Sequence, residues 1–146
     1  MKNSVLVIIS ILVFGFAISC KEKEAVYFYP RELWPDNNGV HINAHGGGLL
    51  YDNGIYYWFG EHKIGGEAGN KAYTGVHCYS SENLKDWRDE GIALHVDAEE
   101  SGSDIESGCI LERPKVVYNS KTKQYVMWFH LELKGMDYKA ARSGIA

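Results

Sequence analysis

Proline, cysteine and positive charge are all scarce in this chain of 146 residues. It has 3 prolines and 3 cysteines, and its formal net charge is −4, with no basic stripe along the sequence. A nucleic-acid partner is not expected, because nucleic acids are bound through clustered lysine and arginine. No pair of cysteine and histidine has zinc-finger spacing, so the sequence predicts no metal site and no cofactor.

Long apolar runs are missing too, except for one at the N-terminus. A short basic start, Met1-Lys2-Asn3, precedes the almost wholly apolar residues 5–19. This run is too short to span a bilayer comfortably as a helix, but it fits the core of a signal peptide. It ends at Cys20, after small residues, where the sequence turns abruptly into the charged residues 21–24.

The position of Cys20 resembles the bacterial lipoprotein cleavage site. The resemblance implies a signal peptide over 1–19 and a lipid anchor on Cys20, which would hold the protein to a membrane of the bacterial cell envelope, facing the periplasm or the surface. Residues 20–33 would be the tether and 34–146 the folded part. The alternatives are an ordinary signal peptide with an unrelated cysteine, or an uncleaved anchor. In such an oxidising compartment Cys78 and Cys109 form either a disulfide or two separately buried thiols.

Aromatic residues and glycine are plentiful, as expected for a folded β protein: 10 Tyr, 4 Trp and 16 Gly. Residues 43–61 form the most informative stretch. Asp52-Asn53-Gly54 stands between two apolar, aromatic-rich runs, which predicts a tight hairpin. The glycines Gly46–Gly48 carry no side chains, so another backbone or a ligand can come close there.

The same plan recurs in 112–131, where a β-branched strand with Tyr118 is followed by a polar turn and a second aromatic strand. Tyr118 follows Tyr51 by 118 − 51 = 67 positions, and Trp128 follows Trp58 by 128 − 58 = 70, so we expect a turn three residues longer in the second copy. A repeat of short strands and turns predicts the four-stranded blades of a β-propeller. Two similar hairpins in one sandwich are the alternative.

Further strands and loops complete the expected first blade. Tyr73–Ser81 alternates well enough for a third strand, with Val76 and Cys78 on one face and His77 and Tyr79 on the other. No helix of useful length is expected after the signal segment. The remaining expectations are a short strand at Val40–Ile42, a fourth, edge strand at Gly91–Leu94, and loops at His62–Lys71 and Ala98–Ser107.

A family resemblance rests on five stretches: AHGGG, YYWFGE, CYSSENLKDWRDEG, ERPKVVYN and YVMWFH. Together they are similar to glycoside hydrolase family 43, and more narrowly to the branch of exo-β-1,3-galactanases, from Trp34 to the C-terminus. The resemblance implies an all-β, five-bladed propeller, of which this chain holds about the first two blades. It also implies inverting hydrolysis of a terminal sugar of a plant polysaccharide.

Two departures from the family pattern bear on catalysis. Most of the family carries a catalytic-base Asp at a place that falls here on His45 or Gly46, although the galactanase-like branch itself lacks this Asp. The family's general acid lies on later blades, so it is expected beyond residue 146. Catalytic residues therefore stay unassigned, and we expect an N-terminal fragment that is inactive alone.

Four residues are candidates for substrate binding: His45, Glu61, Glu112 and Arg113. The Arg113 guanidinium is expected to keep Glu112 ionised and hence a good acceptor for sugar hydroxyls; the alternative is a structural ion pair with Arg113 or Lys115. Glu61 alternatively closes a strand in solvent, and His45 alternatively bonds to the glycine turn. Trp58 and Trp128 either stack on a sugar or belong to the core.

The function that these residues and the resemblance favour is release of terminal galactose from β-1,3-galactan or arabinogalactan side chains. One alternative is a surface glycan-binding lipoprotein without turnover. Another is an arabinofuranosidase or xylosidase of the same family. A last one is a non-functional fragment with open sheet edges.

Overall fold

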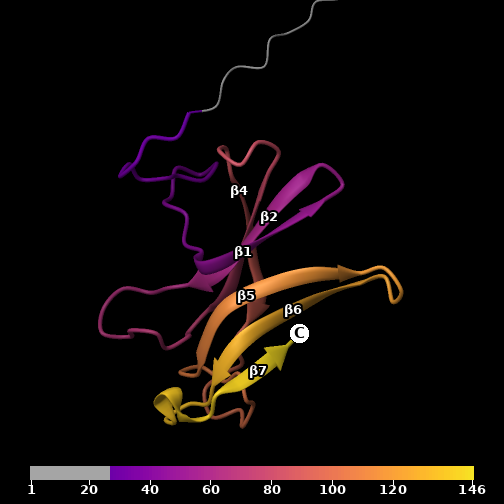
Figure 1. The fold of residues 1–146 in the computed structure, drawn as a ribbon. Helices are drawn as coiled ribbons and strands as arrows, with labels where there is room; N and C mark the ends of the chain where they lie inside the picture. Colours follow the sequence, from indigo (N-terminus) through magenta and orange to yellow (C-terminus); the bar gives the residue numbers. More distant parts are fainter. Residues whose placement is uncertain (1–26) are drawn as a thin grey trace, which may run out of the picture.

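The computed structural model describes residues 27–146, so the predicted signal peptide, Cys20 and the first part of the tether lie outside the described residues. Two antiparallel sheets make up the fold (Figure 1). The first sheet has the order β1-β2-β3-β4, with β1 at His45–Asp52, β2 at Ile55–His62, β3 at Gly75–Ser81 and β4 at Arg88–His95. The second has the order β5-β6-β7, with β5 at Ile110–Asn119, β6 at Gln124–Glu132 and β7 at Arg142–Ile145. A single 3₁₀ turn, η1, covers Asp137–Lys139.

The predicted first hairpin is confirmed. β1 and β2 are joined by Asn53 and Gly54, whose φ angles of 49° and 89° are the positive values that a two-residue hairpin turn needs. Tyr51 and Tyr56 face each other beside this turn, with ring centroids 4.6 Å apart. Cross-strand aromatic pairs of this kind stabilise an antiparallel ladder.

The repeat is confirmed as well, but the predicted match of its tryptophans is wrong. Tyr118 pairs with Tyr125 as Tyr51 pairs with Tyr56, and the connecting turns are 120–123 and 53–54. The second turn is therefore two residues longer, not three. Counting from the tyrosine pairs, the structural counterpart of Trp128 is Phe59, which lies opposite Gly48 as Trp128 lies opposite Lys115. A one-residue slip puts a side chain on the other face of the sheet.

Both hairpins also carry the same irregularity. The register shifts by one residue between His45 and Gly48 in β1, and again between Glu112 and Lys115 in β5. Within these bulges Gly46 has φ 56° and Arg113 has φ 54°. A β-bulge re-aims the side chains beside it, and the two bulges lie at corresponding ends of the two sheets.

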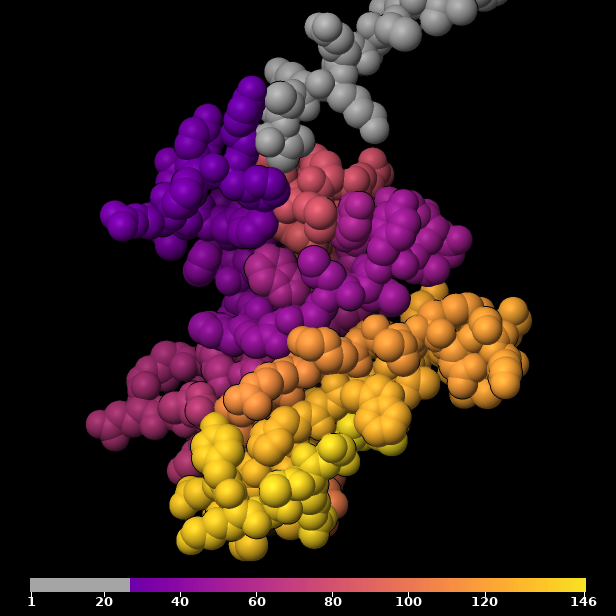
Figure 2. All heavy atoms as spheres, in the orientation of Figure 1, coloured from indigo at the N-terminus to yellow at the C-terminus, as the bar shows by residue number. Residues whose placement is uncertain are grey.

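The sheets pack face to face, and the first sheet is covered on both sides. One apolar cluster lies between the sheets and includes Val76, Phe129 and Leu131. A second cluster, with Tyr79 and Trp87, lies on the far face of the first sheet. Figure 2 shows the N-terminal segment, in indigo, on the opposite side of this sheet from the second sheet. β3 is therefore buried on both faces, which the predicted alternation of its side chains did not indicate.

Some strand limits differ from expectation. Val40–Ile42 forms no strand and only an isolated bridge from His41 to Pro35. β4 is longer than the predicted Gly91–Leu94, although it is an edge strand as expected. Cys78 and Cys109 are both buried and free, which decides against the disulfide. Within residues 27–146 no helix is long and apolar enough to cross a membrane.

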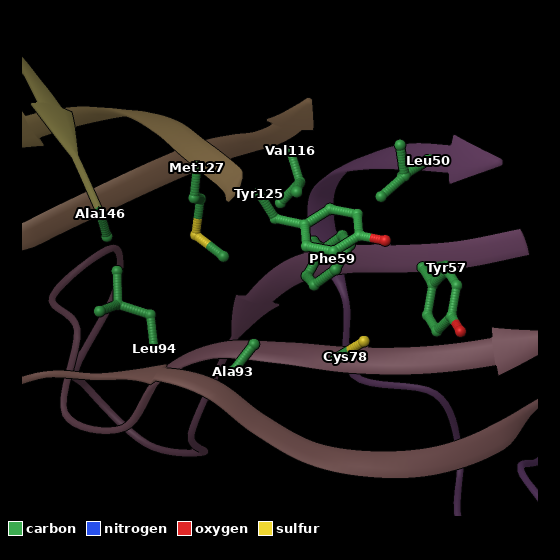
Figure 3. A pocket seen from close by; sticks show the side chains of 10 residues that line it. All are labelled: Leu50, Tyr57, Phe59, Cys78, Ala93, Leu94, Val116, Tyr125, Met127 and Ala146. Atoms are coloured by element: carbon green, nitrogen blue, oxygen red, sulfur yellow. The ribbon is translucent and has the colours of Figure 1, made fainter. Parts of the chain in front are cut away.

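An apolar cavity of about 440 Å³ lies between the two sheets. Figure 3 shows Leu50 and Phe59 from the first sheet and Val116 and Met127 from the second around it. Its lining is mostly hydrocarbon, so it offers few partners for hydroxyl groups. A cluster of polar side chains lies elsewhere, at the bulged ends of the sheets.

Candidate functional site

The bulges bring polar side chains from both sheets together. β1 and β2 place His45 opposite Glu61, and β5 and β6 place Glu112 opposite His130. Two loops add further groups, one after β2 and one containing η1. We call the resulting set the inter-blade cluster; its members are Glu61, Lys63, Asn70, Glu112, Arg113 and Tyr138.

Glu61 links the two sheets. Its side chain is buried, its Oε1 accepts the backbone N–H of Arg113 at 2.9 Å, and its Oε2 lies 2.7 Å from Lys63 Nζ. A buried carboxylate needs such partners, because charge is costly to remove from water. Glu61 is therefore not the solvated strand end of the alternative interpretation. It is already engaged on both oxygens.

Other parts of the chain occupy the space beside Gly47 and Gly48: β2 of the same sheet at Gly47, and β5 of the second sheet at Gly48. A Cβ on Gly47 would lie 2.2 Å from Trp58 Nε1, and one on Gly48 would lie 2.8 Å from the carbonyl of Pro114. Lys115 lies across the glycines, and its Nζ donates to the carbonyl of Gly47 at 2.9 Å. The sequence allows either another part of the chain or a ligand to come close to these glycines, and in the structure another part of the chain does so.

Glu112 is buried and has a close partner that the sequence did not reveal. The hydroxyl of Tyr138 donates to its Oε1 at 2.6 Å. This bond raises the pKa of Tyr138, because the ionised phenol would lose the bond and face the carboxylate. Since Tyr138 satisfies Oε1, Oε2 is the oxygen left for another donor.

Arg113 supplies a guanidinium on the open side of the cluster. Its Nη2 lies 3.9 Å from Glu112 Oε2, and 71% of the side-chain surface is exposed. A contact this long and this exposed is a weak ion pair, so Glu112 is not held mainly by Arg113. The predicted alternative partner, Lys115, points instead at the glycine carbonyls.

The cluster closes into a ring of contacts. Lys63 Nζ lies 3.4 Å from Asn70 Oδ1, and the Asn70 amide donates to the hydroxyl of Tyr138 at 2.6 Å. Asn43 fixes the backbone of Lys63 through two hydrogen bonds of 2.7 and 2.9 Å. Donors and acceptors thus lie close together at one edge, with a planar guanidinium beside a carboxylate. Such a set suits the vicinal hydroxyls of a sugar.

The other candidates lie apart from this ring. His45 is exposed, lines a shallow hollow with Trp34 and Trp58, and makes no side-chain hydrogen bond within residues 27–146. Trp58 packs on Trp87 in the core at 5.3 Å, which favours the packing role. Trp128 is exposed on the second sheet. Three of the four predicted binding residues, Glu61, Glu112 and Arg113, therefore meet, and His45 does not join them.

Sequence reasoning missed three members of the cluster, Lys63, Asn70 and Tyr138. Lys63 and Asn70 fall in a glycine-rich segment expected to be an exposed loop, and Tyr138 follows Gly135 in a stretch with no periodicity. Only the spacing of Lys63 two positions after Glu61, on one face of an extended chain, gave a usable signal.

A second polar group lies on the far face of the first sheet. His77 Nε2 is 2.6 Å from Asp89 Oδ1, and His77 Nδ1 is 3.0 Å from His62 Nδ1. The hydrogen bond from His77 lowers the pKa of Asp89. The pKa of His62 is lowered chiefly by burial and, to a smaller extent, by the charge of His77. In the described part of the chain no three His, Cys, Asp or Glu side chains are grouped to hold a metal ion.

Searches of family models and of curated proteins gave no match. Solved structures do match. A glycoside hydrolase family 43 β-1,3-galactosidase with galactodeoxynojirimycin is 55% identical, with a TM-score of 0.74, over 80% of this chain and 33% of its own. An exo-β-1,3-galactanase from Phanerochaete chrysosporium with β-1,3-galactotriose is 37% identical, with a TM-score of 0.70, over 79% and 25%. One from Clostridium thermocellum is 37% identical, with a TM-score of 0.64, over 78% and 23%.

The fold and these relatives together define the class of protein: the chain forms two blades of a β-propeller of the glycosidase type. It belongs to glycoside hydrolase family 43, in the branch of the exo-β-1,3-galactanases. It spans about a third or less of the length of the structures named above.

Proposed function

We propose that the inter-blade cluster binds the terminal galactose of β-1,3-linked galactan, as part of an inverting glycosidase. The observation that carries the proposal is the state of Glu112: buried, bonded to Tyr138 through one oxygen, and beside the exposed Arg113 guanidinium through the other. A carboxylate and a guanidinium in this arrangement accept from and donate to neighbouring hydroxyls. The structures similar to this chain include complexes with galactodeoxynojirimycin and β-1,3-galactotriose.

We further propose that the described residues bind but do not hydrolyse. Inversion requires an acid and a base carboxyl about 6.5–9.5 Å apart, with a water between the base and the sugar. Glu61 holds Lys63 and the Arg113 N–H, and Glu112 accepts from Tyr138, so both carboxyl groups act as acceptors here and neither is placed as the proton donor. A missing general acid costs about 10²–10⁴ in rate. Binding without turnover is therefore expected of this chain taken alone.

Calorimetry with β-1,3-galactobiose tests the binding step. Glu112→Gln keeps the shape of the side chain and removes its charge, so we expect at least about tenfold weaker binding, the value of one charge-assisted hydrogen bond. Asp36→Asn is the matched control, because Asp36 is also a buried carboxylate but lies in the 35–41 turn. Equal losses in both variants would refute the proposed role of Glu112. Release of galactose from β-1,3-galactan by the wild-type chain would refute the proposal that it binds without turnover.

We also propose, from the sequence alone, that Cys20 carries a lipid that anchors residues 34–146 to the bacterial cell envelope through the 20–33 tether. Cys20→Ser should then move the protein from the membrane fraction to the soluble fraction. Unchanged membrane association of the variant would mean that the apolar run itself is the anchor.

A further inference from the structure

Glu132, at the end of β6, is the most buried charged residue of the described chain, with 1% of its surface exposed. It does not touch the inter-blade cluster. Its Oε2 accepts the backbone N–H groups of Ala140 and Ala141 at 2.7 and 2.8 Å, and its Oε1 lies 3.0 Å from His130 Nε2. A buried carboxylate needs polar partners, and two of the three partners of Glu132 are backbone N–H groups of the loop that carries Tyr138.

Polar contacts rather than apolar packing hold this loop: besides the bonds to Glu132, the Tyr138 hydroxyl bonds to Glu112 and Asn70. None of the residues of η1 is buried, so apolar packing does not fix the turn. Asp137 and Ala141 both have positive φ, 49° and 50°, which is costly for residues with a Cβ. A strained backbone persists only where surrounding contacts hold it in place. Here the two hydrogen bonds to Glu132 hold the C-terminal end of the strained segment.

Glu132 reaches Tyr138 by a second route as well. His130, held by Glu132, stacks against the ring of Tyr138, with centroids 6.0 Å apart and an interplanar angle of 16°. The hydrogen bonds to the 140–141 backbone and the stacking of His130 therefore both act on the position of Tyr138. Tyr138 is half exposed, yet its hydroxyl is held 2.6 Å from Glu112.

We propose that Glu132 is a positioning residue: by holding the 140–141 backbone and His130, it fixes the Tyr138 hydroxyl on Glu112 and so sets which oxygen of Glu112 is free for a sugar hydroxyl. The sugar-binding consequence rests on the proposed function, but the positioning of Tyr138 does not. The two can therefore be tested separately on the same protein.

The test follows the ionisation of Tyr138 in the full chain. Tyrosine is replaced by 3-fluorotyrosine, and the ¹⁹F resonance of residue 138 is assigned by its absence in Tyr138→Phe. Glu132→Asp keeps the charge but withdraws the carboxylate by one methylene, out of reach of the 140–141 N–H groups. Glu132→Gln keeps an oxygen at the original position. Asp36→Ala is the control, because Asp36 also accepts two backbone N–H groups, from Asn38 and Val40, in an unrelated turn.

We expect the raised pKa of Tyr138 to fall toward its ordinary value in Glu132→Asp and to stay raised in Glu132→Gln and Asp36→Ala, because only the first releases the hydroxyl from Glu112. A wild-type pKa in Glu132→Asp overturns the proposal. So does an unfolded Glu132→Asp protein, because Glu132 would then serve the whole fold rather than one turn. Calorimetry with β-1,3-galactobiose completes the test. If the wild type binds no sugar while the tyrosine pKa responds as expected, the proposed function fails and the positioning role stands.

Discussion

Replacing Gly46 by alanine tests whether the Glu61 carboxylate excludes a side chain from position 46. Gly46 has φ 56°, and a Cβ there would lie 2.6 Å from Glu61 Oε1. Gly69 provides the matched control: its φ is 59°, and nothing lies within 4 Å of its would-be Cβ. The two substitutions therefore share their backbone strain and differ only in the contact.

The expected losses of stability follow from two contributions, the backbone strain and the steric overlap with Glu61. The left-handed conformation costs a residue with a Cβ about 1–2 kcal/mol, which applies to both variants. At Gly46 the new methyl also overlaps a carboxylate that cannot withdraw freely, because Lys63 and the Arg113 N–H hold it. Overpacking of this kind adds about 1–3 kcal/mol. Gly46→Ala should therefore cost about 2–5 kcal/mol, and Gly69→Ala about 1–2 kcal/mol.

Urea unfolding of both variants measures the difference, provided that the slope of the transition is unchanged. Adding Glu61→Ala to each then tests the cause, since the excess cost of Gly46→Ala should largely vanish when the carboxylate is absent. Equal losses for the two single variants, or an excess that survives the removal of the Glu61 side chain, would refute the argument that the carboxylate excludes a side chain at position 46.

Three further predictions use the same unfolding assay. Arg113→Gly removes a side chain from a backbone at φ 54°, so stability should stay level or rise by up to about 1 kcal/mol. Affinity for β-1,3-galactobiose should fall about tenfold because the guanidinium is lost. A clear loss of stability would contradict this prediction. Lys115→Met deprives two glycine carbonyls of their donor and should cost about 1–2 kcal/mol, whereas Lys121→Met, at an exposed turn, should cost little. Burial lowers the pKa of His62 below 6.5, so the unfolded chain binds more protons once the pH drops through that value, and stability should fall as it does; an equal fall in His62→Gln would assign the effect to other groups.

Local rules predicted the parts of the fold that depend on neighbouring residues. The Asp52-Asn53-Gly54 turn placed the first hairpin, and the alternation in β3 placed Val76 and Tyr79 on opposite faces. The tryptophan match failed because Trp-Phe in β6 and Trp-Phe in β2 are identical in letters but shifted by one position in register. The turn accounts for two of the three extra positions, and the third lies within β6, between Tyr125 and Trp128; this odd residue reverses the face on which the tryptophan lies.

The site was predictable only where it lies on strands. Glu61 and Glu112 were found because each follows or opens an aromatic or β-branched strand, whereas Tyr138 reaches Glu112 from a loop 26 positions away, by bonds to Glu132 that no local pattern records. No rule of turn chemistry predicts a tyrosine at that point, because the contact is tertiary.

Gly46 and Arg113 occupy equivalent positions in the two blades, and the same backbone conformation has a different role in each. Both residues sit in the same bulge of corresponding strands, at nearly the same positive φ. In the first blade a Cβ at that position would lie 2.6 Å from Glu61 Oε1, which favours glycine there. In the second blade the position opens to solvent and holds an arginine that is 71% exposed, despite the strain. Strain kept at an open position, where packing does not require it, is expected where the side chain itself is needed, and here that side chain stands beside Glu112.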